Sequence, residues 1–418
     1  TVLGNIVGKG SVSLESAAAA ISVAGISTDQ VGSYILLNTD TGNITTTGEI
    51  SSIGTGSTIN IYNYNGGDIT IGGDVFTGND GSILFEVGNY AQGGNGNMNI
   101  NGAVYTTGTN PLRGITVSSS CVGTVNVNKA ISTNGLINLV VYDQTNTLNV
   151  AKDVTLTAGN RVEFEADSPA NTINLASGAN VIAGSFVYDY GTGNLNLGSN
   201  ITVTNAIYNG GFCGIQLNHL STNLTGAVSL KSASTTAANG IINLGNINGA
   251  QNLTLEATGP IYFSTGSGIT GVGQTTALNT ITVTNSAGML VSSPFTAANV
   301  VLSDSSGIIT FNGPTVISKS LTTTAKGYGV AFNGTTVLAG SPVFLNTGTT
   351  SFAGNTSLTS GATITGNATS TATLAGTIVS GGAFNIGAIA STSIDLDSNP
   401  NTVTLILNSA SATSTIAS

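Results

Sequence analysis

Three carboxylates recur at comparable places along the chain and are the first residues to consider for chemistry. Asp143, Glu165 and Asp189 follow one another at intervals of 22 and 24 residues. If they stacked about 4.8 Å apart they would repel one another, and Ca²⁺, which favours carboxylate oxygens, would relieve that repulsion. The turn Gly78–Gly81 (GNDG) also resembles one copy of a calcium-binding nonapeptide. We favour solvent-facing carboxylates in different registers and keep a calcium site as the alternative, with no other cofactor indicated.

Enzymatic chemistry has little support in the sequence. Polysaccharide-cleaving β-helices group carboxylates with lysine or arginine, whereas the 8 Lys and Arg residues here are scattered. His219 is the one histidine, and we interpret it as a turn or surface residue. No nucleophile motif, phosphate-binding loop or metal-ligand spacing is present. We therefore expect a protein that is not an enzyme and keep polysaccharide cleavage as a remote alternative.

The two cysteines are placed far apart along the chain. Cys121 and Cys213 are separated by 92 positions, which is three to four repeats, or roughly 15–19 Å at the strand spacing. A disulfide needs Cα atoms within about 7 Å. We expect no bridge between them and interpret each as a small buried apolar residue.

The elements that would position these residues are indicated by an internal repeat. A short phrase recurs in which an apolar residue is followed by Thr or Asn and usually by a second apolar residue. Its central residues lie 22 to 29 positions apart, with a mean of about 26. They are Thr45, Thr70, Asn99, Asn126, Asn149, Asn174, Asn196, Thr225, Thr254 and Thr282.

Alternation of apolar and polar residues indicates strands with one buried face. Two or three such strands in each repeat, separated by Gly and Asn turns, form one coil of a solenoid. We predict an all-β fold, a right-handed parallel β-helix of about 16 coils. Residues 1–418 are expected to form one continuous solenoid, with regular coils in 1–290 and shorter, more irregular coils in 291–418. Tandem β-sandwiches are the competing architecture, but they would not repeat one phrase at one interval.

The composition excludes several classes of partner. The chain carries 8 Lys and Arg against 18 Asp and Glu, a net charge of −10. So few cations cannot form a basic patch, so we expect no nucleic-acid binding and no attraction to an anionic membrane surface. No apolar run reaches about 18 residues, so no membrane-spanning helix is expected.

The column of Thr and Asn residues is the most regular polar feature. We expect these side chains to point outward, one above another, as a hydrogen-bonded ladder along a sheet. The alternative is a flat polar face that binds a glycan, another surface or ice. Ice binding would require short coils of equal length, which the variable spacing does not provide.

The phrases GNITTTGEI, GGDITIGGDV, GNMNINGAV, NTLNVAKDVTLTAG and NTINLASGANV carry a family resemblance. In style, over nearly the whole chain, the sequence resembles bacterial type V secretion passengers, namely filamentous-haemagglutinin-like exoproteins and autotransporter β-helices. The resemblance implies a right-handed parallel β-helix that is exported to the cell surface, commonly for adhesion. Neither a two-partner secretion cap nor translocator strands is recognised. A cleaved passenger, a fragment and a different outer-surface protein therefore stay open.

Two functional hypotheses follow. The first is a secreted or cell-surface protein, structural or adhesive, whose partners are glycans or proteins of a cell surface. The second is a subunit that assembles with itself, axially or laterally, into an extracellular filament or surface layer. The second is physically available because a solenoid exposes two terminal edges and this chain has few charges to keep neighbours apart.

Overall fold

The computed structural model contains strands from β1 (Asn5–Gly8) to β49 (Thr415–Ile416) and, among the residues it describes, no helix. It describes residues 4–88, 94–108, 110, 112–142, 145–207, 213–236, 238–266, 268–365, 370–375 and 377–387, and the backbone of 391–394, 404–407 and 415–416. The strands pair in parallel and stack as a β-solenoid of about 15 turns in total. The predicted solenoid is therefore confirmed, and the tandem sandwiches are excluded for the described strands.

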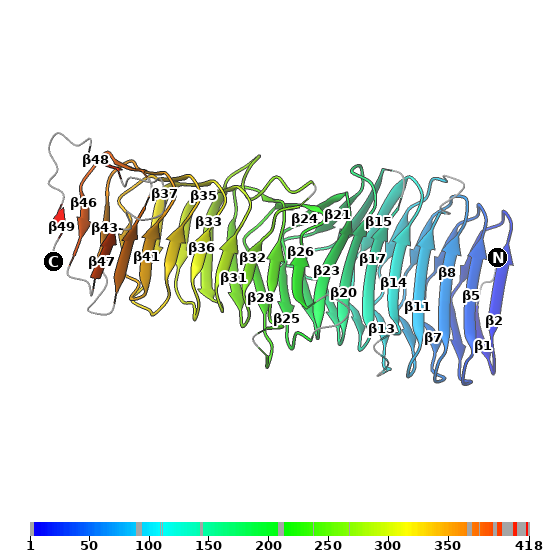
Figure 1. Ribbon diagram of the computed structural model, residues 1–418. Coiled ribbons are helices and arrows are strands. Elements are labelled where there is room, and N and C mark those ends of the chain that lie inside the picture. The colour runs from blue at the N-terminus through cyan, green and yellow to red at the C-terminus, as the bar shows by residue number, and fades with distance from the viewer. Residues whose placement is uncertain are drawn as a thin grey trace. The chain divides into compact units, whose positions relative to one another are not determined.

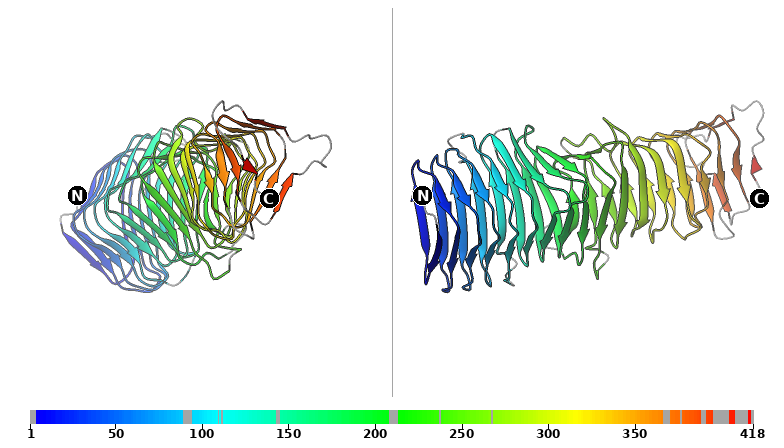
Figure 2. Two further views of the ribbon diagram at one scale, coloured as in Figure 1. Left: turned by 90° about the vertical axis from the view of Figure 1, so that its left-hand side faces the viewer. Right: turned by 180° about the vertical axis from the view of Figure 1, so that it is seen from behind.

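The chain divides into two compact units. The first comprises Thr1–Cys213 and His219–Gly226, and the second comprises Gly214–Asn218 and Ala227–Ser418. In the first unit each turn supplies one strand to each of three faces, and successive turns lie side by side in chain order (Figure 1). The further views in Figure 2 show the same order of turns within this unit.

We name each of the three faces of the first unit after side chains that recur on it: asparagine on the first, serine and threonine hydroxyls on the second, and tyrosine on the third. The asparagine face consists of β3 (Ile21–Val23), β6 (Ile44–Thr46), β9 (Ile69–Ile71), β12 (Met98–Ile100), β15 (Gly123–Val127), β18 (Asn146–Val150), β21 (Thr172–Leu175), β24 (Asn194–Leu197) and β27 (Ser221–Leu224). The hydroxyl face consists of β1, β4 (Gly25–Thr28), β7 (Ile50–Ser52), β10 (Val75–Thr77), β13 (Val104–Thr106), β16 (Ile131–Thr133), β19 (Thr155–Ala158), β22 (Asn180–Ala183) and β25 (Asn200–Val203). The tyrosine face consists of β2 (Val12–Ser16), β5 (Tyr34–Thr39), β8 (Thr58–Asn63), β11 (Ser82–Val87), β14 (Gly114–Ser119), β17 (Leu136–Val141), β20 (Arg161–Ala166) and β23 (Phe186–Gly191).

The core of the first unit consists of inward columns of branched apolar residues. On the tyrosine face Ile59, Ile83, Ile115 and Ile137 are register partners in successive turns, and all are at most 1% exposed. β-Branched side chains suit this position because they pack against their neighbours above and below on a pleated surface. The alternation predicted from sequence is thus realised as stacked buried columns.

The turns between the asparagine and hydroxyl faces bring the backbones of successive coils close together. A Cβ atom added at Gly102 would lie 1.8 Å from the carbonyl oxygen of Gly73. One added at Gly73 would lie 2.2 Å from the carbonyl carbon of Gly48. Glycine is required in these turns because the stacked backbones leave no room for a side chain.

The second unit is built differently. Its first series of strands consists of β26 (Gly214–Leu217), β29 (Ile242–Leu244), β32 (Ile261–Phe263), β34 (Met289–Val291), β36 (Ile309–Phe311), β38 (Val330–Phe332), β41 (Thr349–Phe352), β44 (Thr371–Leu374) and β47 (Ser391–Ile394). Its second series consists of β28 (Val228–Ser232), β31 (Asn252–Ala257), β33 (Leu278–Asn285), β35 (Phe295–Leu302) and β37 (Thr315–Thr323). The short β30 (Ile247–Asn248) lies outside both series.

The long strand β37 ends the second series because it pairs with two strands of the next turn. One branch consists of β39 (Thr336–Leu338), β42 (Thr356–Leu358), β45 (Thr377–Ser380) and β48 (Thr404–Leu407). The other consists of β40 (Val343–Phe344), β43 (Ala362–Ile364), β46 (Phe384–Ile386) and β49. In this part of the chain, Met289, Ile309, Val330 and Thr350 are successive register partners, 20 or 21 residues apart.

A column of stacked phenylalanine rings distinguishes the core of the second unit. The rings of Phe311, Phe332 and Phe352 stack at centroid distances of 5.0 and 5.5 Å, with interplanar angles of 9°. Phe295 and Phe344 meet this column edge to face. Stacked and edge-to-face rings are favourable arrangements of aromatic quadrupoles, so they add to the free energy gained by burying the rings.

Candidate functional site

The asparagine face carries the polar column predicted from the sequence. Asn126, Asn149, Asn174 and Asn196 each donate from Nδ2 to the Oδ1 of the asparagine in the preceding turn, at 2.9, 2.9, 2.7 and 2.7 Å. Each amide in the run therefore uses its donor on one side and its acceptor on the other. The ladder interpretation of this column is confirmed.

The ladder departs from the predicted column at its end. Asn223 of β27, not Thr225, is the register partner of Asn196. Thr254 and Thr282 were also wrongly placed, since they pair with each other on β31 and β33 of the second unit, where Thr254 pairs with Ser229. The physical reason is that Leu or Ile alternating with Thr is compatible with any half-buried strand, so the pattern does not show to which face a strand belongs.

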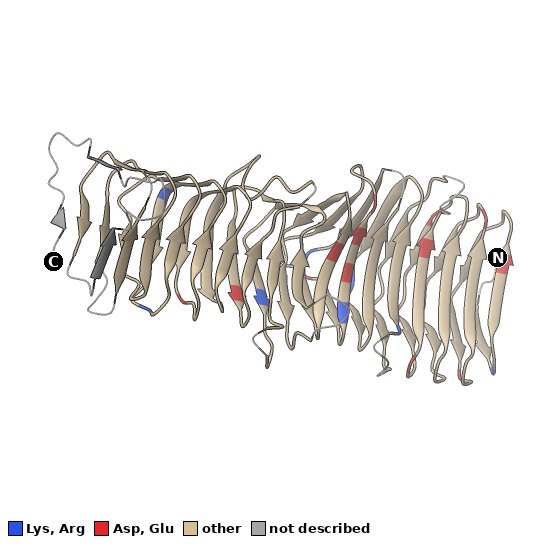
Figure 3. Ribbon diagram, viewed as in Figure 1, with Lys and Arg blue, Asp and Glu red and all other residues tan. Residues whose placement is uncertain are grey.

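The tyrosine face carries a different outward surface. Its outward positions hold both aromatic and acidic side chains, and Figure 3 shows acidic segments, in red, on strands of this face. One column of register partners consists of Glu15, Asn38, Tyr62, Glu86, Ser118, Val140, Glu165 and Tyr190, and within it Ser118 and Val140 are buried. The adjacent column brings Glu163 next to Tyr188.

These two columns enclose a cavity at β20 and β23. The cavity has a volume of about 290 Å³ and is lined by Glu163, Phe164, Glu165, Tyr188 and Tyr190. Tyr190 is 55% exposed, whereas Glu163 is 8% exposed. Tyrosine rings and glutamate carboxylates therefore line a shallow recess, which we call the tyrosine–glutamate cavity.

One cation balances part of the charge in this cavity. Arg161 Nε lies 2.5 Å from Glu163 Oε1, and the guanidinium carbon of Arg161 lies 5.8 Å from the centre of the Phe186 ring. The arginine is therefore held between a carboxylate and an aromatic ring. Glu165 forms no ion pair with any described residue, and it accepts a hydrogen bond from the Tyr142 hydroxyl at 3.5 Å.

The titration of the groups around the cavity reflects burial and excess negative charge. Burial first, and then the charges of Asp167 and Glu163, raise the pKa of Glu165 above its usual value. Burial together with Glu165 and Asp167 raises the pKa of Tyr142 to about 12. Burial and a hydrogen bond to Glu163 raise the pKa of Tyr188. All three shifts have the direction expected where negative charge is poorly solvated.

The predicted acidic column is not assembled as one site. Glu165 points outward into the tyrosine–glutamate cavity, but Asp189 is the register partner of the inward Phe164 and is fully buried. Asp143 lies outside the described residues. Among the residues that the structure describes, no group of three or more His, Cys, Asp or Glu side chains could hold a metal ion.

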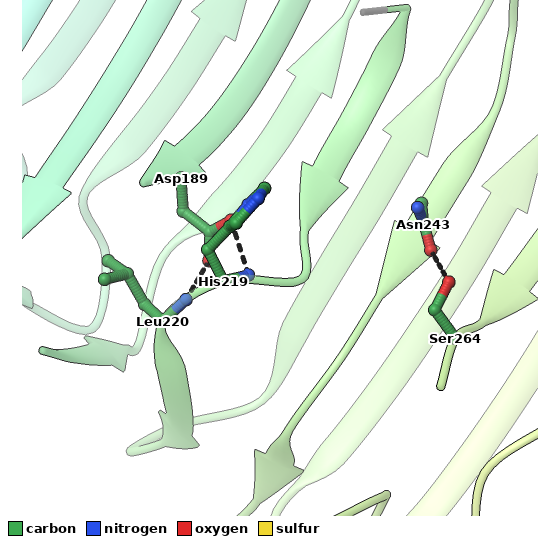
Figure 4. Close-up of polar contacts among 5 residues, drawn as sticks. All are labelled: Asp189, His219, Leu220, Asn243 and Ser264. Carbon is green, nitrogen blue, oxygen red and sulfur yellow. Dashed lines mark hydrogen bonds and ion pairs between the residues drawn. The ribbon is translucent and has the colours of Figure 1, made fainter. Parts of the chain in front are cut away.

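Asp189 instead anchors the turn that precedes β27 (Figure 4). Its carboxylate accepts hydrogen bonds from the backbone N–H of His219 at 3.1 Å and of Leu220 at 2.8 Å. The Nδ1 of His219 lies 3.3 Å from the same carboxylate, and this contact raises the pKa of the imidazole from 6.5. His219 is thus a turn residue, as predicted, but one with a buried acidic partner. Figure 4 also shows a second polar contact, in which the Ser264 hydroxyl donates to Asn243 in the second unit.

The remaining residues considered for chemistry have structural roles. In the turn Gly78–Gly81, Asp80 has a φ of 57° and accepts a hydrogen bond from the Asn110 backbone N–H at 3.0 Å. Cys121 and Cys213 are free and buried, so the prediction of unbridged apolar cysteines is confirmed. Burial raises the pKa of both thiols.

The tyrosine–glutamate cavity was missed in the sequence. In the segment FVYDY (186–190), Phe186, Tyr188 and Tyr190 form one alternate set and Val187 and Asp189 form the other, and neither composition shows which set faces inward. Its pairing with β20 decides this, because Val187 stacks on Val162 and places Tyr188 and Tyr190 outside. A tyrosine pair facing a glutamate pair one coil earlier was the signal that could have located the cavity.

Comparison with known proteins finds no matching family model, no matching curated protein and no matching solved structure. No helix of the described residues is long and apolar enough to cross a membrane. The function is therefore argued from the geometry of the surface.

Proposed function

We propose that this protein is a non-enzymatic structural protein of the cell exterior that displays a carbohydrate-binding surface on a β-solenoid scaffold. The observation that carries this proposal is the tyrosine–glutamate cavity, with two tyrosine rings beside carboxylates on an outward face. Protein surfaces bind sugars by combining an apolar ring wall with hydrogen-bonding groups at its rim, because a sugar ring has an apolar face and polar edges.

The scaffold supports this role because its register fixes where the rings and carboxylates lie. β20, which carries Glu163 and Glu165, is paired over six residues with β17 and again with β23, so it has a hydrogen-bonded neighbour on each side. On another face of the same turns, the asparagine ladder joins the coils by side-chain hydrogen bonds. A binding surface held by rigid elements loses little conformational entropy when a ligand binds.

The exterior location is proposed on compositional grounds and on the resemblance to type V secretion passengers. The chain is acidic and has few lysines, with a net charge of −10, and both cysteines are buried and free. Such passengers are commonly adhesive surface proteins, and a carbohydrate-binding face gives this chain a means of adhesion.

The experiment that tests the proposal has two parts. Purified protein is applied to an array of neutral, acidic and basic glycans, with Tyr190→Ala as the variant that removes the exposed ring of the cavity and Tyr34→Ala as a control at another exposed tyrosine. We expect glycan binding that Tyr190→Ala weakens and Tyr34→Ala preserves. Intact cells that express the protein are then treated with protease to establish surface exposure. Absence of binding to every glycan, or protection of the protein on intact cells, would contradict the proposed function.

A further inference from the structure

We propose that the tyrosine–glutamate cavity selects amino sugars, and that it recognises the ammonium group of a glucosamine-type residue between its tyrosine rings and its glutamates. This inference rests on the proposed function, since it names the class of carbohydrate for the same surface. It is argued from the charge balance of the cavity, the placement of its rings and its size.

The charge balance favours a cationic ligand. Glu163 and Glu165 both line the cavity, and Arg161 pairs with Glu163. No described residue forms an ion pair with Glu165, and burial together with Asp167 and Glu163 raises its pKa. A cation placed beside Glu165 would therefore relieve repulsion that the protein itself leaves in place.

The rings favour the same ligand. Tyr190 and Tyr188 are two residues apart on β23, so both side chains are on the outward side of the strand. An ammonium group near the face of a tyrosine ring is attracted by the ring quadrupole, and the apolar face of a sugar packs on the ring carbons. The ring of Tyr190 also has an aromatic neighbour, the ring of His219, at a centroid distance of 6.0 Å.

The shape of the cavity favours a sugar ring over a lysine side chain. Its volume of about 290 Å³ is at the lower end for ligand pockets. A recess on a flat sheet beside a half-exposed ring suits a pyranose that lies on the surface, with its amine turned towards Glu165. A lysine side chain would fit a narrow slot better than this recess. Binding of lysine is tested separately with poly-lysine.

The test compares two probes that differ in charge at each sugar. The full-length protein is titrated calorimetrically with the glucosamine tetramer and with the N-acetylglucosamine tetramer, at a pH low enough to protonate the free amines and high enough to keep Glu165, whose pKa is raised, ionised. We expect the glucosamine tetramer to bind and the acetylated tetramer to bind at least about tenfold more weakly, since a charge-assisted contact is lost. Poly-lysine is titrated as a third probe.

Three variants locate the contact. Glu165→Gln removes the carboxylate that has no ion pair and should weaken binding of the glucosamine tetramer about tenfold, while binding of the acetylated tetramer changes little. Tyr190→Ala should weaken both. Glu86→Gln is the matched control, because Glu86 occupies the same column of register partners three turns earlier, outside the cavity. Circular dichroism confirms that each variant is folded.

Each outcome separates this inference from the proposed function. Equal affinity for the two tetramers, or an unchanged affinity in a folded Glu165→Gln variant, would overturn the amino-sugar inference and leave carbohydrate binding in place. Binding of poly-lysine as tight as that of the glucosamine tetramer would overturn the choice of a sugar. No binding to either tetramer, with binding to other glycans on the array, would overturn the inference alone.

Discussion

At the scale of single residues, Asp189 departs from the pattern of the core. It occupies an inward position in a column where the preceding turns hold Leu139 and Phe164. A carboxylate in such a place is costly unless it is hydrogen-bonded. The backbone N–H groups of His219 and Leu220 provide those bonds, so the charge fixes the turn that precedes β27.

The contact between His219 and Asp189 predicts a pH dependence of stability. The pKa of His219 is raised from 6.5, so the ion pair contributes fully below about pH 6.5 and is lost as the pH rises through the folded-state pKa. We expect His219→Gln to abolish this contribution, which should stay below about 1 kcal/mol because the imidazole is partly exposed. Thermal unfolding of both proteins across this pH range measures the difference.

The control for this prediction is Thr225→Ala, an exposed residue just after the same strand that has no titrating group. It should keep the pH profile of the unaltered protein. If His219→Gln showed that same profile, the imidazole would not contribute to stability through Asp189.

At the scale of the elements, each strand is specified by the strands above and below it. Many inward residues of the first unit are branched and aliphatic, whereas those of the second unit include the stacked rings of Phe311, Phe332 and Phe352. Outward residues specify register in another way, because an asparagine can satisfy its neighbour's amide only when the two are directly stacked. The ladder therefore penalises any shift of one strand along the next.

The ladder predicts a measurable loss of stability on truncation. Asn174 donates to Asn149 and accepts from Asn196, both at 2.7 Å, so Asn174→Ala removes two side-chain hydrogen bonds and leaves the Oδ1 of Asn149 and the Nδ2 of Asn196 without these partners. We expect the free energy of unfolding of the first unit to fall by about 1–2 kcal/mol. Chemical denaturation followed by circular dichroism measures this change.

Asn180→Ala provides the matched comparison. The Asn180 side chain bonds to the Gly178 carbonyl within its own turn, at 3.3 Å, and does not join two coils. Its removal should cost less than the removal of Asn174. Equal losses at both positions would show that the ladder does not stabilise the stacking of the coils.

At the scale of the whole molecule, charge is the property that distinguishes the chain from most soluble proteins. Charged residues make up 6% of the sequence, and the isoelectric point is about 4.2. A typical domain has about 25%. The net charge of −10 is therefore the main electrostatic barrier to association, because interspersed charges of both signs are scarce.

Acidification should remove this barrier. As the pH falls from 7 towards 4.2, the carboxylates become protonated and the net charge approaches zero. We expect reversible self-association to begin over this interval, as seen by light scattering, and to disappear when the pH returns to 7. Circular dichroism of the same samples serves as the control that the protein remains folded. A protein that stayed monodisperse at pH 4.2 would show that charge is not what separates the molecules.

The sequence by itself determined the parallel solenoid and its inward columns. A phrase repeated about every 26 residues, with apolar residues on alternate positions, leaves few other ways to bury Ile, Val and Leu. It also determined the asparagine ladder from Asn99 to Asn196 and the unbridged cysteines, because both follow from the spacing of residues along a regular coil.

The tertiary structure decided what depends on pairing between turns. Within FVYDY (186–190), either alternate set of side chains could face the core, and pairing with β20 turned Asp189 inward and Tyr190 outward. The same pairing brought these tyrosines beside Glu163 and Glu165, which are more than twenty positions away in the sequence. A one-residue shift in register exchanges the two faces of a strand, so the site could be known only once the neighbouring coil was in place.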